Sequence, residues 1–494
     1  MNWLELTSLL PLLLVASISV ILLLLIAFVR DHKLTCWVTC VGFAMAAYLA
    51  FADMGNTAQQ VTPLLIVDDF SRLLVGVVLL VSLACGWMSY AYLETADEIR
   101  EEYYILLSLA ALGACVLIAS NHFASMFIGL ELMSVSLFAM VGYMAHSKQQ
   151  ANMTLEAGVK YMVLSGVSSS FLLFGVALIY AYAGNLSIDL EVAAGGPHLQ
   201  SGYLVVGSAL LLVGVAFKMS WIPFHMWTPD VYQGAPAPVT GFLAGAVKVA
   251  VFAFAMRWLM MAQGDYLSLL LLGLTVMALL SMVMGNLLAL RQNNLKRLLG
   301  YSSIAHMGYI IVTLAATATH GATALSTALE GAAIYLITYA SMTMLAFAVI
   351  SQLAAQDRGF ETGTLAHYTG LLFQQPLLAS ALILAMLALA GMPLTAGFIG
   401  KYYLVLVAVD SQLWLLLSML VLGSALGLYY YLRVILVLCK TPIDDHPIDD
   451  HPIDNQIMVF GMGDKLLLLL LMLMTLWLGL YPTPVIEWVQ LAIA

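Results

Sequence analysis

The sequence predicts an all-α polytopic membrane protein with about 14 transmembrane helices. Apolar residues make up 63% of the chain and charged residues 9%, whereas soluble domains have about 45–50% and about 25%. Each spanning helix needs about 20 mostly apolar residues, and apolar runs of that length follow one another along the 494 residues. The alternating segments of a membrane β-barrel are absent. A soluble enzyme is therefore excluded, and the net charge of −10 argues against a nucleic-acid partner.

Polar residues and Gly/Pro clusters divide the apolar runs into the predicted helices. Their expected ranges are 8–29, 34–52, 70–92, 103–120, 122–144, 154–183, 203–226, 237–259, 266–290, 297–316, 322–352, 373–407, 411–438 and 464–482. The first run has no basic region before it and no small-residue cleavage site after it. We therefore expect a retained helix and not a signal peptide.

Two of these helices are expected to be broken. The seventh ends in WIPFH at 221–225, and the twelfth is interrupted by GMP at 391–393. Interrupted helices in matching positions of two halves are typical of inverted repeats that line a transport pathway, although proline kinks alone are tolerated in membrane helices. We expect four segments: an N-terminal three-helix segment (1–100), two inverted five-helix repeats (101–260 and 261–440), and a final loop and helix (441–494).

Lysine and arginine are distributed unevenly between the two sides of the predicted helices. Eleven lie on one side: Arg30, Lys33, Arg100, Lys148, Arg291, Lys296, Arg297, Arg358, Arg433, Lys440 and Lys465. Only Arg72 and Arg257 lie on the other. Because cytoplasmic loops are the more basic ones, both termini are expected on the periplasmic side of a bacterial inner (plasma) membrane.

The loop before the last predicted helix contains a short repeat, PIDDH, at 442–446 and 447–451 and in part at 452–454. Asp/His repeats can bind metals, but a proline at every fifth position leaves no fixed frame for ligands. We therefore expect an acidic cytoplasmic spacer. The five cysteines show neither CxxC nor zinc-finger spacing, so no metal site or iron–sulfur cluster is expected in this chain.

Four lysines lie within predicted helices: Lys160, Lys218, Lys248 and Lys401. A lysine at the centre of a spanning helix costs roughly 2.5–3.5 kcal/mol on insertion scales, which indicates a functional use. At about 1.5 Å per residue, Glu131, Lys248 and His306 fall about 14–17 Å from a helix end, near the middle of the bilayer. Lys218 precedes the first break. Lys401 follows the second and is expected nearer the outer face.

Each ionisable residue also has a structural interpretation. Lys160 is close enough to a helix end for its side chain to reach the interface. Glu131 could act only as a neutralising partner, and Glu330 could be purely structural. His306 could be a hydrogen-bonded core histidine, and His225 could cap carbonyls freed by the neighbouring proline.

The chemistry of this set suits proton transfer. Burial disfavours the charged form of a lysine, and a nearby carboxylate favours it again. Glu131 and Lys218 are expected to form such a pair, with Lys248, His306 and Lys401 as onward sites. Broken helices admit water and free backbone groups to line a path.

Several motifs resemble one known family. The run FKMSWIPFHMWTPDVYQGAP at 217–236 resembles the signature of the antiporter-like subunits of respiratory complex I. The helix that contains Lys248, the segment YSSIAHMGY at 301–309, and the segment from GMP to GFIGK at 391–401 resemble the same family. The resemblance extends over essentially the full chain.

The resemblance implies a proton-translocating subunit of a redox-driven complex. In this family the proton-channel residues are a fifth-helix glutamate, seventh- and eighth-helix lysines, and a twelfth-helix lysine or glutamate. By matching motif these are Glu131, Lys218, Lys248 and Lys401. Some relatives end in a long lateral helix; only about a dozen residues follow the last expected helix here, so no such element is expected.

The resemblance also implies what lies outside this chain. The sequence has no nucleotide-binding glycine fingerprint and no cluster cysteines, so no cofactor is expected here. NADH, FMN, iron–sulfur clusters and quinone are expected in partner subunits. The expected partners are neighbouring antiporter-like subunits, small membrane subunits and lipid. A subunit of an Mrp-type cation/proton antiporter or a membrane-bound hydrogenase is the alternative. An inert scaffold is a third.

Overall fold

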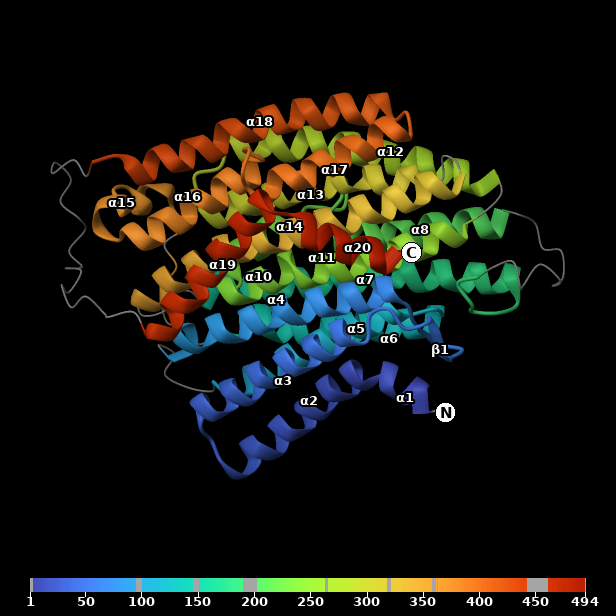
Figure 1. Cartoon of the computed structure of the whole chain (residues 1–494), viewed down its shortest axis with the longest axis horizontal. Helices are drawn as coiled ribbons and strands as arrows, with labels where there is room; N and C mark the ends of the chain where they lie inside the picture. Colours follow the sequence, from blue (N-terminus) through green and yellow to red (C-terminus); the bar gives the residue numbers. More distant parts are fainter. Residues whose placement is uncertain are drawn as a thin grey trace.

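A computed structural model describes residues 3–94, 100–144, 151–189, 202–262, 265–317, 321–357, 361, 363–441 and 461–493. Long helices lie side by side and nearly parallel to one another (Figure 1). The prediction of an all-α, multi-pass architecture is confirmed. The PIDDH repeat lies outside the described residues, so its expected spacer role stays a prediction, as does the division into four segments.

The first third of the chain contains α1 (Trp3–Ser8), α2 (Leu10–Phe28), α3 (His32–Ala52), β1 (Gln59–Thr62), β2 (Leu65–Val67), α4 (Asp69–Glu94), α5 (Glu102–Ala119), α6 (Phe123–Val141) and α7 (Ala151–Ala183). The central part contains α8 (Gly202–Met219), α9 (Trp227–Gly234), α10 (Ala237–Ala244), α11 (Ala246–Met261), α12 (Asp265–Leu290), α13 (Leu295–Ala316) and α14 (Gly321–Gln356). The last part contains the 3-10 helix η2 (Leu365–Tyr368), α15 (Leu371–Gln374), α16 (Pro376–Ala390), α17 (Ala396–Asp410), α18 (Trp414–Cys439), α19 (Met462–Leu480) and α20 (Thr483–Ile493).

The number of membrane crossings agrees with the prediction. Among the described residues, 13 helical segments are long and apolar enough to span a membrane. The broken pair α16–α17 supplies the remaining predicted crossing, because each half has only 15 residues. A full crossing needs about 20 residues, so the two halves must act together.

The core lies around three crossings of the central part of the chain. The best apolar windows of α10–α11, α13 and α14 are 94–100% buried, whereas those of α7, α12, α18 and α19 are 22–33% buried. A helix that is apolar all round is a buried one. The central helices therefore hold Lys248 and His306 away from lipid.

The structure confirms both predicted breaks and adds a third. The chain leaves α8 at Met219 and resumes helix in α9, and α16 and α17 are separated by residues 391–395. The predicted helix 237–259 is wrong as one unit, because it divides at Gly245 into α10 and α11. A Cβ at Gly245 would lie 3.0 Å from Val81 Cγ1, so glycine allows a close approach to α4.

A small β-hairpin, β1–β2, was not predicted. It packs on the turn between α5 and α6, where Leu65 pairs with Ser120. Ser125 Oγ and Asn121 N both donate to the Leu64 carbonyl, at 2.7 and 2.9 Å. The hairpin thereby fastens the N-terminal helices to the bundle that follows.

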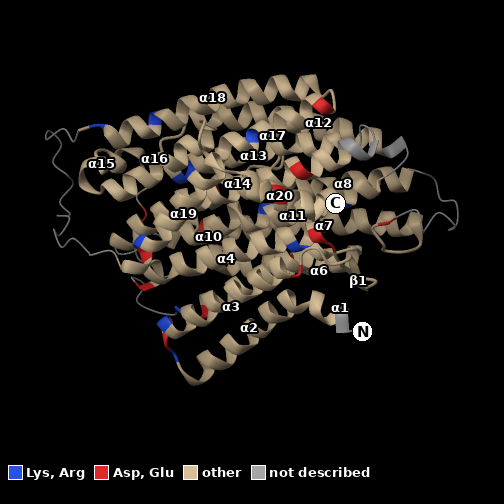
Figure 2. Ribbon diagram, viewed as in Figure 1, with Lys and Arg blue, Asp and Glu red and all other residues tan. Residues whose placement is uncertain are grey.

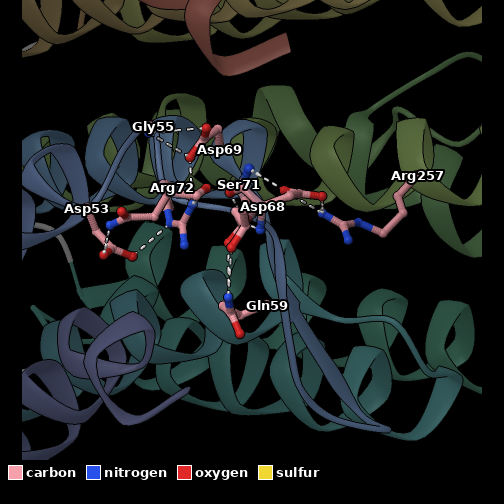
Figure 3. A network of polar contacts seen from close by, with 10 residues as sticks. Asp53, Gly55, Gln59, Asp68, Asp69, Ser71, Arg72 and Arg257 are labelled. Atoms are coloured by element: carbon pink, nitrogen blue, oxygen red, sulfur yellow. Dashed lines mark hydrogen bonds and ion pairs between the residues drawn. The ribbon is translucent and has the colours of Figure 1, made fainter. Parts of the chain in front are cut away.

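Arginine–aspartate pairs hold the same end of the molecule together (Figure 3). Arg72 contacts Asp53 at 2.8 Å and Asp69 at 2.6 Å, and its side chain is only 2% exposed. Arg257 of α11 contacts Asp68 at 2.9 Å. We call these five residues the outer clasp. It joins the start of α4 to the end of α11.

Helix α20, which was also not predicted, lies across α14 and α4 (Figure 1). Trp488 packs on Phe51 with ring centroids 6.0 Å apart. Gln490 Nε2 donates to Glu330 Oε1 at 3.0 Å. Glu330 therefore contacts this surface helix.

Basic residues are concentrated toward the end of the bundle where α15 lies (Figure 2). These basic residues lie near helix ends, because α2 ends on this side of the bundle and α5, α13 and α16 begin there. Lys148 and Arg358 lie outside the described residues. The periplasmic placement of both termini stays a prediction.

Candidate functional site

Three of the four lysines predicted within helices are buried inside the bundle. The exposed fractions are 1% for Lys218, 0% for Lys248 and 9% for Lys401. Each lies beside one of the helix breaks. Their immediate partners determine what these groups can do.

Lys218 lies in the last turn of α8. Its Nζ donates to Ser134 Oγ of α6 at 2.6 Å and to Ser165 Oγ of α7 at 2.7 Å. The ammonium also lies 5.7 Å from the centroid of the Tyr161 ring. Two neutral hydroxyls and an aromatic face therefore surround the nitrogen.

Lys248 reaches from α11 into the break after α8. Its Nζ donates to the Lys218 carbonyl at 3.1 Å and to Ser220 Oγ at 2.5 Å. Ser220 has φ +63°, a conformation uncommon outside glycine, and its hydroxyl accepts from Thr228 Oγ1 at 2.6 Å. The Trp227 ring centroid is 5.5 Å from the Lys248 nitrogen. The turn after α8 thus links the two lysines.

Lys401 lies in α17, and its side chain turns back to the end of α16. Its Nζ donates to the carbonyls of Ala390 at 2.8 Å and Leu389 at 3.2 Å. Gly391 has φ +83°, and a Cβ there would lie 2.8 Å from Lys401 Cδ. The nitrogen therefore lies at the break itself, and the expected position nearer the outer face stays a prediction.

Lys248 and Lys401 share one arrangement. Each donates to carbonyls at the C-terminal end of a helix that stops inside the bundle. Such carbonyls lack intrahelical partners, and the helix dipole places partial negative charge there. A broken helix is therefore a suitable partner for a buried amine that gains and loses charge.

Glu131 is only half-buried, and it does not form an ion pair with Lys218. Its Oε1 accepts from Ser169 Oγ at 2.6 Å. Ser134 and Ser165, the partners of Lys218, lie one helical turn from Glu131 and Ser169 on the same two helices. The two groups therefore bond separate serines and have no direct contact, and their electrostatic coupling stays a prediction.

His306 lies at the centre of a group of tyrosines. Its Nδ1 is 2.7 Å from Tyr335 OH and its Nε2 is 3.2 Å from Tyr431 OH. Tyr431 also contacts Ser302. Both ring nitrogens have hydroxyl partners, which fits a relay position and a hydrogen-bonded core histidine alike.

A second group of hydroxyls lies one turn away from His306. Ser303 Oγ accepts from Tyr339 OH at 2.8 Å and lies 3.3 Å from Tyr232 OH. These three residues, which we call the hydroxyl cluster, join α9, α13 and α14. The cluster lies between the His306 region and the end of α9.

The remaining candidates lie outside the row of lysines. Lys160 is partly exposed and bonds Asp230 at 2.8 Å and Glu156 at 2.6 Å. Its ion pairs favour the structural interpretation. His225 lies half-buried in the first break, and its Nδ1 has no hydrogen-bond partner among the described residues. Glu330 contacts α20, as described above.

Sequence reasoning found the charged residues but missed their hydroxyl partners. Ser165 and Ser169 are four residues apart, which places them on one face of α7. A pair of serines at that spacing in an apolar helix was the available signal. The tyrosines give no such signal, because aromatic residues are common in buried helices.

The partners of the three lysines are neutral in every case. Among the described residues, hydroxyls and carbonyls form all of their hydrogen bonds. A hydroxyl can donate to a neutral amine or accept from an ammonium, and a carbonyl, as at Lys401, accepts an N–H from either form. The site therefore accommodates each lysine in both protonation states, which is the property that a proton-carrying group needs.

The fold and this site define a multi-pass membrane protein with a row of titratable groups at its broken helices. A family model described as "NADH:quinone oxidoreductase/Mrp antiporter, TM" matches residues 120–427. The chain belongs to this family of antiporter-like membrane subunits.

Solved structures agree with that assignment. The chain is 32% identical to one in respiratory complex I from Thermus thermophilus with bound aureothin, with TM-score 0.77 over 97% of this chain and 98% of that one. A chain of the membrane-bound sulfane sulfur reductase, an archaeal respiratory membrane complex, is 25% identical, with TM-score 0.83 over 99% and 97%. The Mrp complex from Dietzia sp. DQ12-45-1b contains the same fold at 22% identity, with TM-score 0.82 over 100% and 97%.

Proposed function

We propose that this chain moves protons across a bacterial inner membrane as a membrane-arm subunit of NADH:quinone oxidoreductase. One observation supports it above all others: three buried lysines are hydrogen-bonded only by neutral groups. A fixed structural charge in a low-dielectric interior needs a paired counter-charge. Among the residues that the structure describes, none supplies such a counter-charge in direct contact, so each lysine is suited to alternate between amine and ammonium.

The proposed route begins at Lys218 and ends beyond Lys401. A proton on Lys218 is stabilised by Ser134, Ser165 and the more distant charge of Glu131. Transfer to Lys248 proceeds through the turn at Ser220, whose hydroxyl bonds the second lysine directly. His306 and its tyrosines lie between Lys248 and Lys401. A change in the charge of Glu131 shifts the protonation equilibrium of Lys218. A neighbouring subunit that changes this charge would therefore drive proton movement along the three lysines.

Within this complex the chain corresponds best to subunit N. Two features support this: a lysine at position 401, where subunit M is expected to have glutamate, and the PDVYQGAP form of the motif at 229–236. The 32% identity to a chain of the Thermus complex adds support. NADH oxidation, FMN, iron–sulfur clusters and quinone reduction are assigned to partner subunits, so this chain contributes proton movement only.

The alternative is a subunit of an Mrp-type cation/proton antiporter or a membrane-bound hydrogenase. The TM-scores of 0.82 and 0.83 to the Mrp and archaeal complexes show how widely the fold is shared.

Copurification of the chain with its neighbours, followed by NADH-driven proton uptake in inverted vesicles, tests the proposal. Quinone-dependent uptake by the copurified complex is the expected result. Cation/proton exchange by vesicles without a redox partner would instead support the alternative.

A further inference from the structure

A buried ion pair lies at the end of the bundle where α10 and α13 begin, apart from the row of lysines. Lys296 of α13 bonds Glu361, and the two side chains are 2% and 6% exposed. The other Glu361 oxygen accepts from the backbone N–H of Ala237, the first residue of α10, at 2.8 Å. A buried charge pair of this kind is costly to desolvate, and the route proposed above does not use it.

Lys296 repeats the arrangement of Lys248 and Lys401. Its Nζ donates to the Ala235 carbonyl at 2.5 Å, where α9 ends. All three lysines therefore bond a carbonyl at the C-terminal end of a short or broken helix. Lys296 differs because it also has a titratable carboxylate beside it.

The pair faces a small cavity of about 10 Å³, close to the minimum volume that holds one water molecule. Asp357 of α14 and His367 of η2 line the same cavity and bond each other at 3.3 Å. Both are more than a third exposed, so they lie on the solvent side of the buried pair. Tyr92 of α4 and Tyr368 are the other titratable groups close to Glu361 and the cavity.

The inward side of the pair leads to the hydroxyl cluster. Ser303 lies seven residues, or two helical turns, beyond Lys296 on α13, which is about 10 Å along the axis. Tyr232 lies in α9, the helix whose C-terminal carbonyl Lys296 bonds. Glu361 and Lys296 therefore lie between the solvent-side residues Asp357 and His367 and the hydroxyl cluster farther along α13.

We propose that Glu361, paired with Lys296, is the proton-accepting residue at a separate entrance to the second half of the chain. This inference rests on the proposed proton-translocating function and identifies a residue at which protons enter the chain. A hydronium ion in the cavity gives a proton to a Glu361 oxygen, so one O–H bond forms, one breaks, and water remains. Protonated Glu361 no longer neutralises Lys296, whose ammonium then gives a proton to the hydroxyl cluster, and the cluster passes a proton on to the imidazole of His306. Glu361 afterwards returns its proton to the Lys296 amine, and both starting states are restored.

The test is NADH-driven proton uptake by inverted vesicles, measured as a function of the pH on the side of Glu361 and normalised to complex content. Glu361→Gln cannot accept a proton, so uptake should fall, and the fall should deepen as that pH rises and free protons become scarce. Glu361→Asp keeps a carboxylate and should recover most of the uptake. Glu361→His, which titrates near neutral pH, should restore uptake with a shifted pH profile, and it serves as the second variant if the glutamine variant fails to assemble.

Glu102→Gln is the matched control, because Glu102 is an ion-paired carboxylate at the same end of the bundle, 2.8 Å from Arg30. It should leave the pH profile unchanged. Two results would overturn the proposal that Glu361 is a proton entrance. One is wild-type uptake in Glu361→Gln; the other is an equal and pH-independent loss in the glutamine, aspartate and histidine variants. Lys248→Ala, measured alongside, separates the two proposals. Full uptake in that variant contradicts the proposed function itself, whereas loss there with normal uptake in Glu361→Gln contradicts the entrance alone.

Discussion

The outer clasp and the row of buried lysines differ in the partners of their charged side chains. In the outer clasp, Arg72 and Arg257 contact aspartates at 2.6–2.9 Å, and an arginine stays protonated under all ordinary conditions. In the bundle interior, Lys218, Lys248 and Lys401 contact only hydroxyls and carbonyls. Paired arginines therefore hold segments together, whereas lysines with neutral partners are free to change protonation.

The difference separates charges that serve stability from charges that serve transport. Removing one member of a buried ion pair leaves its partner uncompensated, which costs about 3–5 kcal/mol. Removing a buried lysine with neutral partners removes the burial cost of the lysine itself. Substitutions in the outer clasp should therefore lower stability, whereas substitutions of the buried lysines should lower proton pumping.

The largest effect is expected from Lys248→Ala. Proton pumping should fall by more than about tenfold, because a positioned proton-transfer group contributes roughly 10²- to 10⁴-fold. Thermal stability of the assembled complex should change little. Arg72→Ala is the matched comparison, and it should lower the thermal inactivation temperature. A stability loss in Lys248→Ala as large as that in Arg72→Ala would remove the distinction between the two kinds of charge.

Lys401→Ala should give a partial defect. The substitution leaves the carbonyls of Leu389 and Ala390 without their donor and removes the titratable group at the second break. Lys401→Glu should recover part of the pumping, because a protonated carboxyl can donate to one carbonyl. Pumping rates normalised to complex content would check this order, and a glutamate variant worse than alanine would show that positive charge is required.

Glu131→Gln should impair pumping less severely than Lys248→Ala, because Glu131 acts on Lys218 only through space. Glu131→Asp retains the charge and should be milder still. Ser169→Ala, which removes the hydrogen bond and keeps the carboxylate, is the matched control and should be close to wild type. Equal defects in all three would mean that the shape of this region matters and its charge does not.

The smallest effect is expected from removal of one PIDDH unit between 442 and 454. Exposed polar loops tolerate changes in length, so assembly and quinone reductase activity should stay near wild type. Both can be measured in membranes. A large loss would show that the loop binds a partner subunit.

The sequence was sufficient for the crossings, for two of the three breaks, and for the buried charged residues. Long apolar runs and proline clusters are local signals, so 221–225 and 391–393 could be found without a structure. The break at Gly245 could not, because the apolar run continues through it and only the close approach to Val81 requires glycine. The β-hairpin and α20 were missed because apolar runs reveal only segments long enough to cross a membrane, and the two strands have four and three residues and α20 has 11.

The partners of the lysines were beyond sequence reasoning. Which helix faces which depends on packing, so Ser134 and Ser165 could not be assigned to Lys218. The lack of a direct contact between Glu131 and Lys218 depends on packing in the same way. Depth along a helix places the two residues at similar levels, but it does not say that serines lie between them.

The most direct test of the central claim is proton pumping by Lys248→Arg. Arginine keeps a positive charge at the break but does not release a proton. If Lys248 carries a proton, NADH-driven uptake in vesicles with normal complex content should be nearly as low as in Lys248→Ala. If uptake returns close to wild type, Lys248 is a fixed positive charge, and the account of a proton-carrying row is contradicted.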